Sequence, residues 1–158
     1  MSSTGWPNPQ LKNLERIGSL VAEATSHSEI QRLLSLADAS LSGAQTKSLA
    51  VEPRFQLAYG AAHHLALAGL RANNYRTASR EGHRMLVFQV LPHSVGLDPA
   101  TARTLDRAHR KRNELEYTGA VDVPESETND LIAAVRMLQQ RVHAWLRAHR
   151  PELLETGV

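Results

Sequence analysis

Cysteine is absent from the sequence, which excludes disulfide scaffolds, zinc–cysteine sites and cysteine nucleophiles. Residues that favour strands are scarce and do not alternate with polar residues, whereas Ala and Leu dominate. No apolar run is long enough to span a bilayer, because His or Arg interrupts each run within a few residues. Residues 1–9 are polar and lack the apolar stretch of a signal peptide. These absences predict an all-α fold and a cytoplasmic protein that does not bind membranes.

Several enzyme motifs are missing as well. The sequence contains no phosphate-binding glycine loop, no Gly-x-Ser-x-Gly elbow, no His-Glu-x-x-His and no Glu-x-x-His. The absence of Glu-x-x-His argues against a di-iron helical bundle. The eight histidines show no spacing that is typical of a metal site. We therefore predict neither a metal nor a cofactor.

The length and composition are those of one soluble domain. The chain has 158 residues, of which 42% are hydrophobic and 22% are charged, enough to bury one core. We predict a disordered N-terminal tail over 1–9, a single α-helical bundle over 10–150 and a C-terminal tail over 151–158.

Apolar residues recur at helical spacing along six segments. The predicted helices cover about 10–24, 26–42, 54–72, 79–91, 99–117 and 125–149. Ser26 and Glu29 have capping-box spacing, Asp98 precedes a proline that suits a first helical turn, and Gly119 is a plausible C-cap. The third helix has an Ala-rich stripe that ends at Gly69 and lets a neighbouring helix approach closely. We expect this helix to be central and the first two helices to be an N-terminal addition.

Charge is unevenly distributed along the chain. The 18 basic residues include only three lysines, and arginine can hold a phosphate with two parallel hydrogen bonds, although codon bias explains the preference equally well. Residues 71–112 carry a local charge of +6, and residues 113–130 carry a local charge of −6. Such a boundary either orients an anionic ligand or pairs two subunits head to tail.

The fifth predicted helix has two distinct sides. Arg103, Arg107, Arg110 and Glu114 share the solvated side, with Arg110 and Glu114 spaced as an i,i+4 pair. Arg112 lies in the apolar stripe on the opposite side. Because an unpartnered buried guanidinium is costly, Arg112 either pairs with Glu116 one turn later or lines a polar notch that contacts phosphate.

The segment Arg112-Asn113-Glu114-Leu115-Glu116-Tyr117 resembles the motif of HEPN domains (higher eukaryotes and prokaryotes nucleotide-binding), in which an Arg, often followed by Asn, precedes a His near the end of a helix. The similarity extends back through Tyr59 to His64, Gly69 to Arg71 and Gly82-His83. It covers about residues 54–138 and implies a HEPN-like core over about 53–150.

The resemblance implies a function. HEPN domains are typically dimers whose paired motifs meet in a cleft, and many are metal-independent endoribonucleases that act as toxins or in defence, some paired with a minimal nucleotidyltransferase antitoxin. In them the Arg steadies the scissile phosphate and the His supports attack by the ribose 2′-hydroxyl. Other members cleave nothing and bind a nucleotide or a partner protein. We accordingly expect a homodimer that binds RNA or a nucleotide, with a nucleotidyltransferase-type antitoxin as the partner protein.

This chain has Tyr117 where the family has its His. A phenol titrates near a pKa of ~10 and is a poor general base, although it can donate a hydrogen bond to phosphate or stack on a base. His109 lies one turn before Arg112 and could reach the same notch. The predicted catalytic residues are Arg112, Asn113, Tyr117 and His109. A basic set is predicted either to follow an RNA backbone or to form a solvated face: Arg76, Arg80, Arg84, Arg107, Arg110 and Lys111.

Other residues have plainer interpretations. Of His63 and His64, we expect one to be a hydrogen-bonded interior residue and the other to lie at the boundary. We predict a packing or capping role for His83 and a half-buried anchoring role for Tyr59. Two functions therefore stay open: an RNA-directed endoribonuclease, or a non-catalytic HEPN module that binds a nucleotide or a nucleotidyltransferase.

Overall fold

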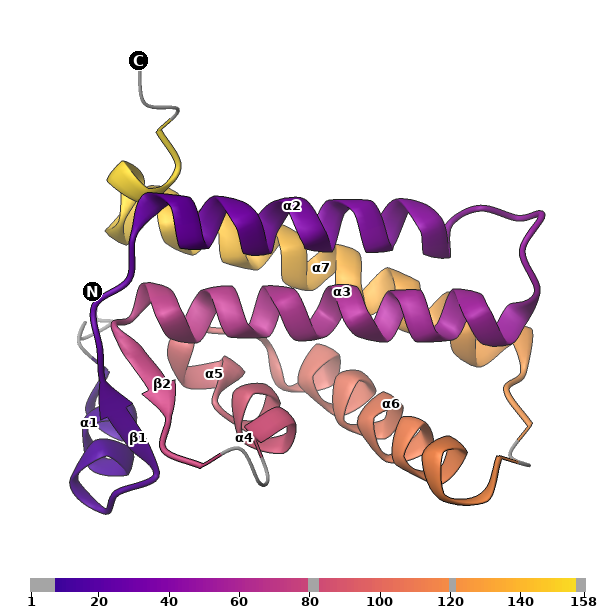
Figure 1. The fold of residues 1–158 in the computed structure, drawn as a ribbon, viewed down its shortest axis with the longest axis horizontal. Helices are drawn as coiled ribbons and strands as arrows, with labels where there is room; N and C mark the ends of the chain where they lie inside the picture. Colours follow the sequence, from indigo (N-terminus) through magenta and orange to yellow (C-terminus); the bar gives the residue numbers. More distant parts are fainter. Residues whose placement is uncertain (1–7, 80–82, 120–121, 156–158) are drawn as a thin grey trace.

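The computed structural model describes residues 8–79, 83–119 and 122–155 and shows a helical bundle with one small β-hairpin (Figure 1). The elements over these residues are α1 (Pro9–Arg16), β1 (Leu20–Ala22), α2 (His27–Ala44), α3 (Val51–Ala72), β2 (Tyr75–Thr77), α4 (His83–Gln89), α5 (Leu91–Ser94), α6 (Pro99–Thr118), α7 (Glu125–His149) and the 3-10 turn η1 (Pro151–Leu153). None of the described helices is both long enough and apolar enough to cross a membrane.

The helix α3 is the centre of the bundle. It contacts α2, α4, α5, α6 and α7, with α2 alongside it and α6 crossing obliquely on its other side (Figure 1). Its small residues Ala58, Ala62 and Gly69 are buried, as the Ala-rich stripe predicts. A Cβ at Gly69 would lie 2.9 Å from Val95 Cγ1, so this glycine permits the close approach of the segment after α5.

Helix ends follow the predicted capping residues. Ser26 Oγ accepts a hydrogen bond from the Glu29 N–H at 3.2 Å, and Asp98 Oδ2 accepts one from the Thr101 N–H at 3.0 Å. Gly119 closes α6 with a left-handed φ of 65°. The helix α7 spans the sixth predicted segment. The predicted helices that correspond to α2, α6 and α7 are therefore confirmed, with ends within a few residues of the prediction.

The prediction of one helix over 10–24 was wrong in its second half. The helix α1 ends at Arg16, and Gly18 adopts a φ of 87°, which reverses the chain and ends the helical path. Residues 20–22 then pair antiparallel with 75–77, with Leu20 opposite Thr77. Each strand has only three residues, too few to give a period-two pattern in the sequence. The fold is thus mostly helical rather than wholly so.

The fourth predicted helix also divides. Its described part, α4, ends at Gln89, and Pro92 lies in the first turn of the separate helix α5. The predicted helix end before Pro92 thus lies within two residues of the end of α4. Leu91 begins α5, and Pro92 fits its first turn because that turn needs no N–H there.

The helix α2 belongs to the core and is not an addition outside it. Its buried face, which includes Ile30, Ala37 and Leu41, packs on α3 and α7. The segment after α7 also packs on the bundle: Leu153 is buried, and its carbonyl accepts a hydrogen bond from Gln31 Nε2 at 3.0 Å. Part of the predicted C-terminal tail therefore contributes to the folded domain.

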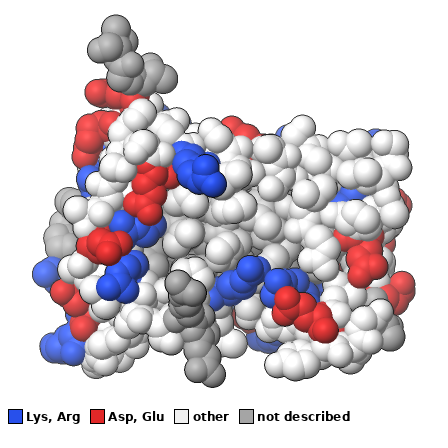
Figure 2. All heavy atoms as spheres, viewed as in Figure 1, with Lys and Arg blue, Asp and Glu red and all other residues white. Residues whose placement is uncertain are grey.

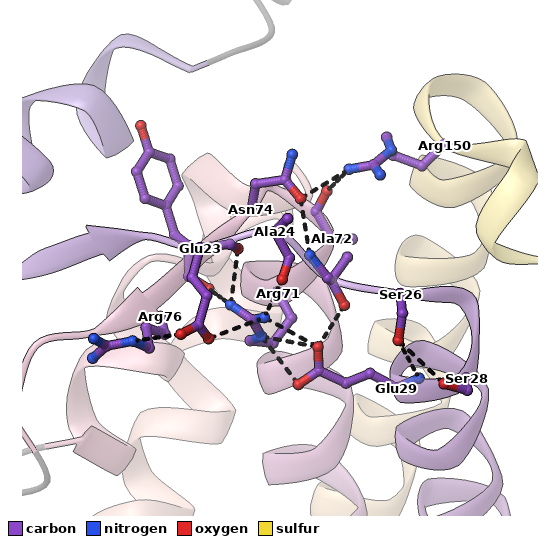
Figure 3. A network of polar contacts seen from close by, with 12 residues as sticks. Glu23, Ala24, Ser26, Ser28, Glu29, Arg71, Ala72, Asn74, Arg76 and Arg150 are labelled. Carbon is purple, nitrogen blue, oxygen red and sulfur yellow. Dashed lines mark hydrogen bonds and ion pairs between the residues drawn. The ribbon is translucent and has the colours of Figure 1, made fainter.

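A buried arginine joins the hairpin to the bundle (Figure 3). Arg71, near the end of α3, is 5% exposed and donates to both carboxylate oxygens of Glu29 on α2 at 3.1–3.2 Å. It also donates to the backbone carbonyls of Glu23, Ala24 and Tyr75. Burial raises the pKa of Glu29, but hydrogen bonds from Arg71 and Thr25 outweigh it and hold that pKa below its ordinary value.

Candidate functional site

The candidate site is built on Tyr59, in the middle of α3. Its side chain is 2% exposed, and its hydroxyl lies 2.9 Å from Nδ1 of His109 on α6. Nε2 of His109 lies 3.3 Å from Nδ2 of Asn113, one turn further along α6. An amide nitrogen only donates, so Nε2 accepts, and Nδ1 carries the proton that is donated to the phenol oxygen. These contacts assign one tautomer to His109.

The environment of His109 favours its neutral form. Burial lowers the pKa of this imidazole, and the positive charges of Arg112 and Arg84 lower it further, whereas Asp106 opposes them. A neutral imidazole keeps a lone pair at Nε2 near neutral pH. This atom has the protonation state that a general base requires.

Two guanidiniums lie against the Tyr59 ring. Arg112 Cζ is 5.4 Å and Arg84 Cζ is 6.0 Å from the ring centroid, both within cation–π range. Burial raises the pKa of the Tyr59 phenol, although a hydrogen bond from Arg84 and the charges of both arginines act against this rise. Within the described part of the chain, no carboxylate pairs with the Arg84 cation.

The contacts of Arg112 match the pairing interpretation. Its Nη2 lies 2.8 Å from Glu116 Oε1, one turn later on α6. The side chain is 19% exposed and also lies over the buried Tyr59 ring. Glu116 is 58% exposed, so this ion pair is weakly held and can be exchanged for another anion.

Tyr117 is not brought together with Arg112 within one chain. Its side chain is 90% exposed, and five residues along a helix place it about 140° around the axis from Arg112. Of the four predicted catalytic residues, three thus cluster near Tyr59: His109, Arg112 and Asn113. Tyr117 points elsewhere.

Three further histidines adjoin the site. The His63 ring lies 5.5 Å from the His83 ring and 6.4 Å from Phe88, centroid to centroid. Burial, and secondarily the charge of Arg84, lowers the pKa of His63 to about 3. His63 Nε2 and His64 Nδ1 are buried atoms with no hydrogen-bond partner among the residues that the structure describes, whereas we expected one of these two histidines to be hydrogen-bonded in the interior. His83 begins the described part of α4 and bonds Thr77 Oγ1 through Nδ1 at 2.6 Å, which agrees with a packing or capping role.

Three of the six predicted RNA-binding residues pair with acids: Arg76, Arg110 and Lys111. Arg76 pairs with Glu23, and Lys111 pairs with Glu127. Arg110 pairs with Asp106 one turn before it, whereas the sequence spacing suggested Glu114. Arg107 donates to Thr104 Oγ1 at 3.1 Å, and Arg80 lies outside the described residues. On the face in Figure 2, blue and red residues intermix, and a broad uncharged area lies over α2 and α3.

Sequence reasoning missed the central place of Tyr59. It predicted a half-buried anchor, whereas the ring is buried and contacts His109 and Phe88. The available signal was the position of a phenol within an apolar stripe, because a buried tyrosine hydroxyl usually finds a polar partner. Which partner it finds depends on how α6 crosses α3, and no local pattern reports that crossing.

Among the described residues, no group of three or more His, Asp or Glu side chains is arranged to hold a metal ion. Comparisons of the chain with protein-family models, curated proteins and solved structures find no significant match.

Proposed function

We propose that this is a HEPN-type protein that binds RNA at the Tyr59 site and cleaves it without a metal ion. The observation that carries the proposal is Arg112, which lies over the Tyr59 ring and, in the described part of the chain, pairs with the exposed carboxylate of Glu116. The pKa of His109, which contacts the same ring, is lowered by burial. A phosphodiester that displaces Glu116 gains a bidentate guanidinium contact. Arg84 supplies a second positive charge next to the same ring.

The proposed reaction is attack by the ribose 2′-hydroxyl on the adjacent phosphorus. The 2′-oxygen–phosphorus bond forms, the bond from phosphorus to the 5′-oxygen breaks, and a 2′,3′-cyclic phosphate and a 5′-hydroxyl result. Asn113 turns its amide toward the phosphate, which frees Nε2 of His109 to accept the 2′-hydroxyl proton. The departing 5′-oxygen takes a proton from water, and His109 releases its own proton to water, which restores the neutral imidazole. Arg112 stabilises the charge that develops on the phosphate oxygens.

Tyr117 enters this scheme only in a homodimer. Within one chain it points about 140° away from Arg112, so a phenol that donates to the phosphate must come from a second copy. We propose that two copies pair with Arg112 of one protomer near Tyr117 of the other. A cognate nucleotidyltransferase would then act as an antitoxin by covering this cleft.

A second function has an observation in its favour. His109 is 6% exposed, and the exposed residue at the motif's histidine position is a phenol, which is a weak base. A module that binds a nucleotide or a nucleotidyltransferase through Arg112 and Arg84 needs no general base. This alternative retains the same anion contacts and omits the cleavage step.

One experiment separates the two. Purified protein is incubated with labelled total RNA in EDTA, beside Arg112→Ala, Tyr117→Phe and the matched control Arg103→Ala, which changes an exposed arginine on the same helix. Cleavage to cyclic-phosphate ends that Arg112→Ala abolishes and Arg103→Ala retains supports the nuclease. Nucleotide or RNA binding without cleavage, weakened only by Arg112→Ala, supports the binding module. Neither cleavage nor binding by the folded wild type contradicts both.

A further inference from the structure

A groove separates α6 from α7 on the flank of α6 away from α4. Its cavity volume is about 260 Å³, slightly below the ~300 Å³ at which sites for drug-sized ligands begin. The floor consists of the buried side chains of Phe55, Ala108 and Leu131, from α3, α6 and α7. An apolar floor of this size suits a ligand about as large as one amino-acid side chain.

The two walls of the groove carry opposite charge. The α6 wall includes Arg107 and Lys111, and the α7 wall includes Glu127 and Asp130. Lys111 Nζ lies 3.4 Å from Glu127 Oε2, so one ion pair already bridges the groove. The remaining residues that line it are Thr104, Arg110 and Glu114.

A second pair of opposite charges, Arg107 and Asp130, lines the groove next to the Lys111–Glu127 ion pair. Arg107 precedes Lys111 by one turn, and Asp130 follows Glu127 by about one turn, so in antiparallel helices this pair is the next step along the groove. Yet neither residue forms an ion pair among the described residues. The hydrogen bond that Arg107 forms goes to the neutral Thr104 hydroxyl on its own helix. A cation and an anion that form no ion pair within 8–79, 83–119 and 122–155 therefore line opposite walls above an apolar floor.

We propose that this groove binds a free α-amino acid with an apolar side chain, such as phenylalanine or leucine. The carboxylate of the ligand accepts hydrogen bonds from the Arg107 guanidinium, its ammonium donates to the Asp130 carboxylate, and its side chain covers Phe55, Ala108 and Leu131. The lining carries three cations and three carboxylates, a balance that favours a zwitterion over a phosphate-bearing ligand.

This site is independent of the proposed RNA function. The groove opens between α6 and α7, whereas Arg112 lies over Tyr59 with Arg84 of α4. Loss of RNA cleavage would leave the amino-acid proposal standing, and failure to bind amino acids would leave the nuclease proposal standing.

The test is calorimetric titration of the full chain with L-phenylalanine and L-leucine. Two truncated ligands are titrated in parallel: 2-phenylethylamine, which lacks the carboxylate, and 3-phenylpropionate, which lacks the ammonium. We expect saturable binding of the amino acids and about tenfold weaker binding of each truncated ligand, the loss that one charge-assisted hydrogen bond produces. No saturable binding at millimolar concentrations, or equal binding of phenylalanine and either truncated ligand, overturns the proposal.

Variants locate the binding in the groove. Arg107→Gln should weaken phenylalanine about tenfold and leave 2-phenylethylamine unchanged, whereas Asp130→Asn should weaken phenylalanine and leave 3-phenylpropionate unchanged. The control Arg103→Gln, on the same helix but outside the groove, should change neither. Uniform effects of Arg107→Gln on all ligands would overturn the proposal. A third outcome would also overturn it: the wild type binds no amino acid and is a dimer, and Arg107→Gln dissociates that dimer. A second copy of the chain would then occupy the groove.

Discussion

Tyr59 and His109 are 50 residues apart in the sequence, yet the phenol oxygen lies 2.9 Å from the imidazole Nδ1 where α6 crosses α3. Their rings also stack, with centroids 6.1 Å apart. This contact fixes the rotation of α6 about its axis, and that rotation places Arg112, one turn later, over the same ring. The pair therefore determines where the guanidinium of the proposed phosphate site lies.

Replacement of Tyr59 by Phe should destabilise the protein. The variant keeps the ring but leaves Nδ1 of His109 without its buried acceptor, a loss of about 1–3 kcal/mol in the free energy of unfolding. Denaturant titration measures the change. The control Tyr117→Phe removes a hydroxyl from a side chain that is 90% exposed and should stay within about 0.5 kcal/mol of wild type. Equal effects of the two substitutions would show that the Tyr59–His109 bond contributes nothing.

Arg71→Met should cost about 3 kcal/mol in the free energy of unfolding. The substitution leaves three backbone carbonyls without their guanidinium donor and Glu29 without its cation. The value lies at the lower end of the range for a broken buried pair, because Glu29 is partly exposed and regains water.

Thermal or denaturant unfolding tests this, with Arg147→Met, an exposed position on α7, as the control. Arg71→Lys should recover only part of the loss, since one ammonium cannot reach Glu29 and three carbonyls at once. Full stability in Arg71→Lys would mean that charge alone, and not the guanidinium geometry, holds the hairpin to the bundle.

Two glycines of α3 should respond to alanine in opposite directions. At Gly69 the new Cβ would lie 2.9 Å from Val95 Cγ1, and such overpacking should destabilise the protein by about 1–3 kcal/mol. At Gly60 a Cβ meets nothing within 4 Å, so Gly60→Ala should stabilise the protein by about 0.5–1 kcal/mol through helix propensity.

The double variant Gly69→Ala, Val95→Ala identifies the cause of the first effect. If the steric contact is responsible, Val95→Ala should be less destabilising in the Gly69→Ala background than in wild type. Additive losses would instead mean that the backbone conformation at Gly69 is the source.

The sequence predicted the parts of the fold that local chemistry determines. The caps at Ser26, Asp98 and Gly119 were found because each cap is a short-range motif. The hairpin was missed because three residues after α1 pair with three that lie 55 residues further on, and neither strand is long enough to show a pattern. The separate helix α5 was not predicted because its four residues are too few to show a periodic pattern.

In the candidate site, too, local geometry could be predicted from the sequence, whereas tertiary contacts could not. Helical geometry predicted that Arg112 faces the bundle and needs either a partner or a cleft, and the side chain contacts both Glu116 and the Tyr59 ring. It also predicted that Arg103 and Arg107 face solvent, and both are exposed. The convergence of Tyr59, His109 and Arg84 depends on three helices meeting, which is a property of tertiary packing alone.

Acidification should destabilise the protein through His63. Burial, with the charges of Arg84, His83, His64 and Arg112, lowers the pKa of this imidazole in the folded chain to about 3, against 6.5 for the ordinary group. Below pH 6.5 the unfolded chain therefore binds a proton that the folded chain excludes, and stability falls as the pH drops toward 3. Above pH 6.5 both states are neutral at His63, and this residue contributes no pH dependence.

His63→Leu should flatten this profile. We expect the free energy of unfolding of the wild type to fall between pH 6.5 and 5 more steeply than that of the variant, by at most about 1.4 kcal/mol per pH unit. Denaturant titrations across this window measure the slopes, and the difference at pH 7.5 isolates the packing effect of the substitution. His64, His83 and His109 have lowered pKa values as well, so the variant should retain some dependence. Parallel profiles would show that His63 takes up its proton without unfolding, and that the cluster beside the proposed RNA site admits charge.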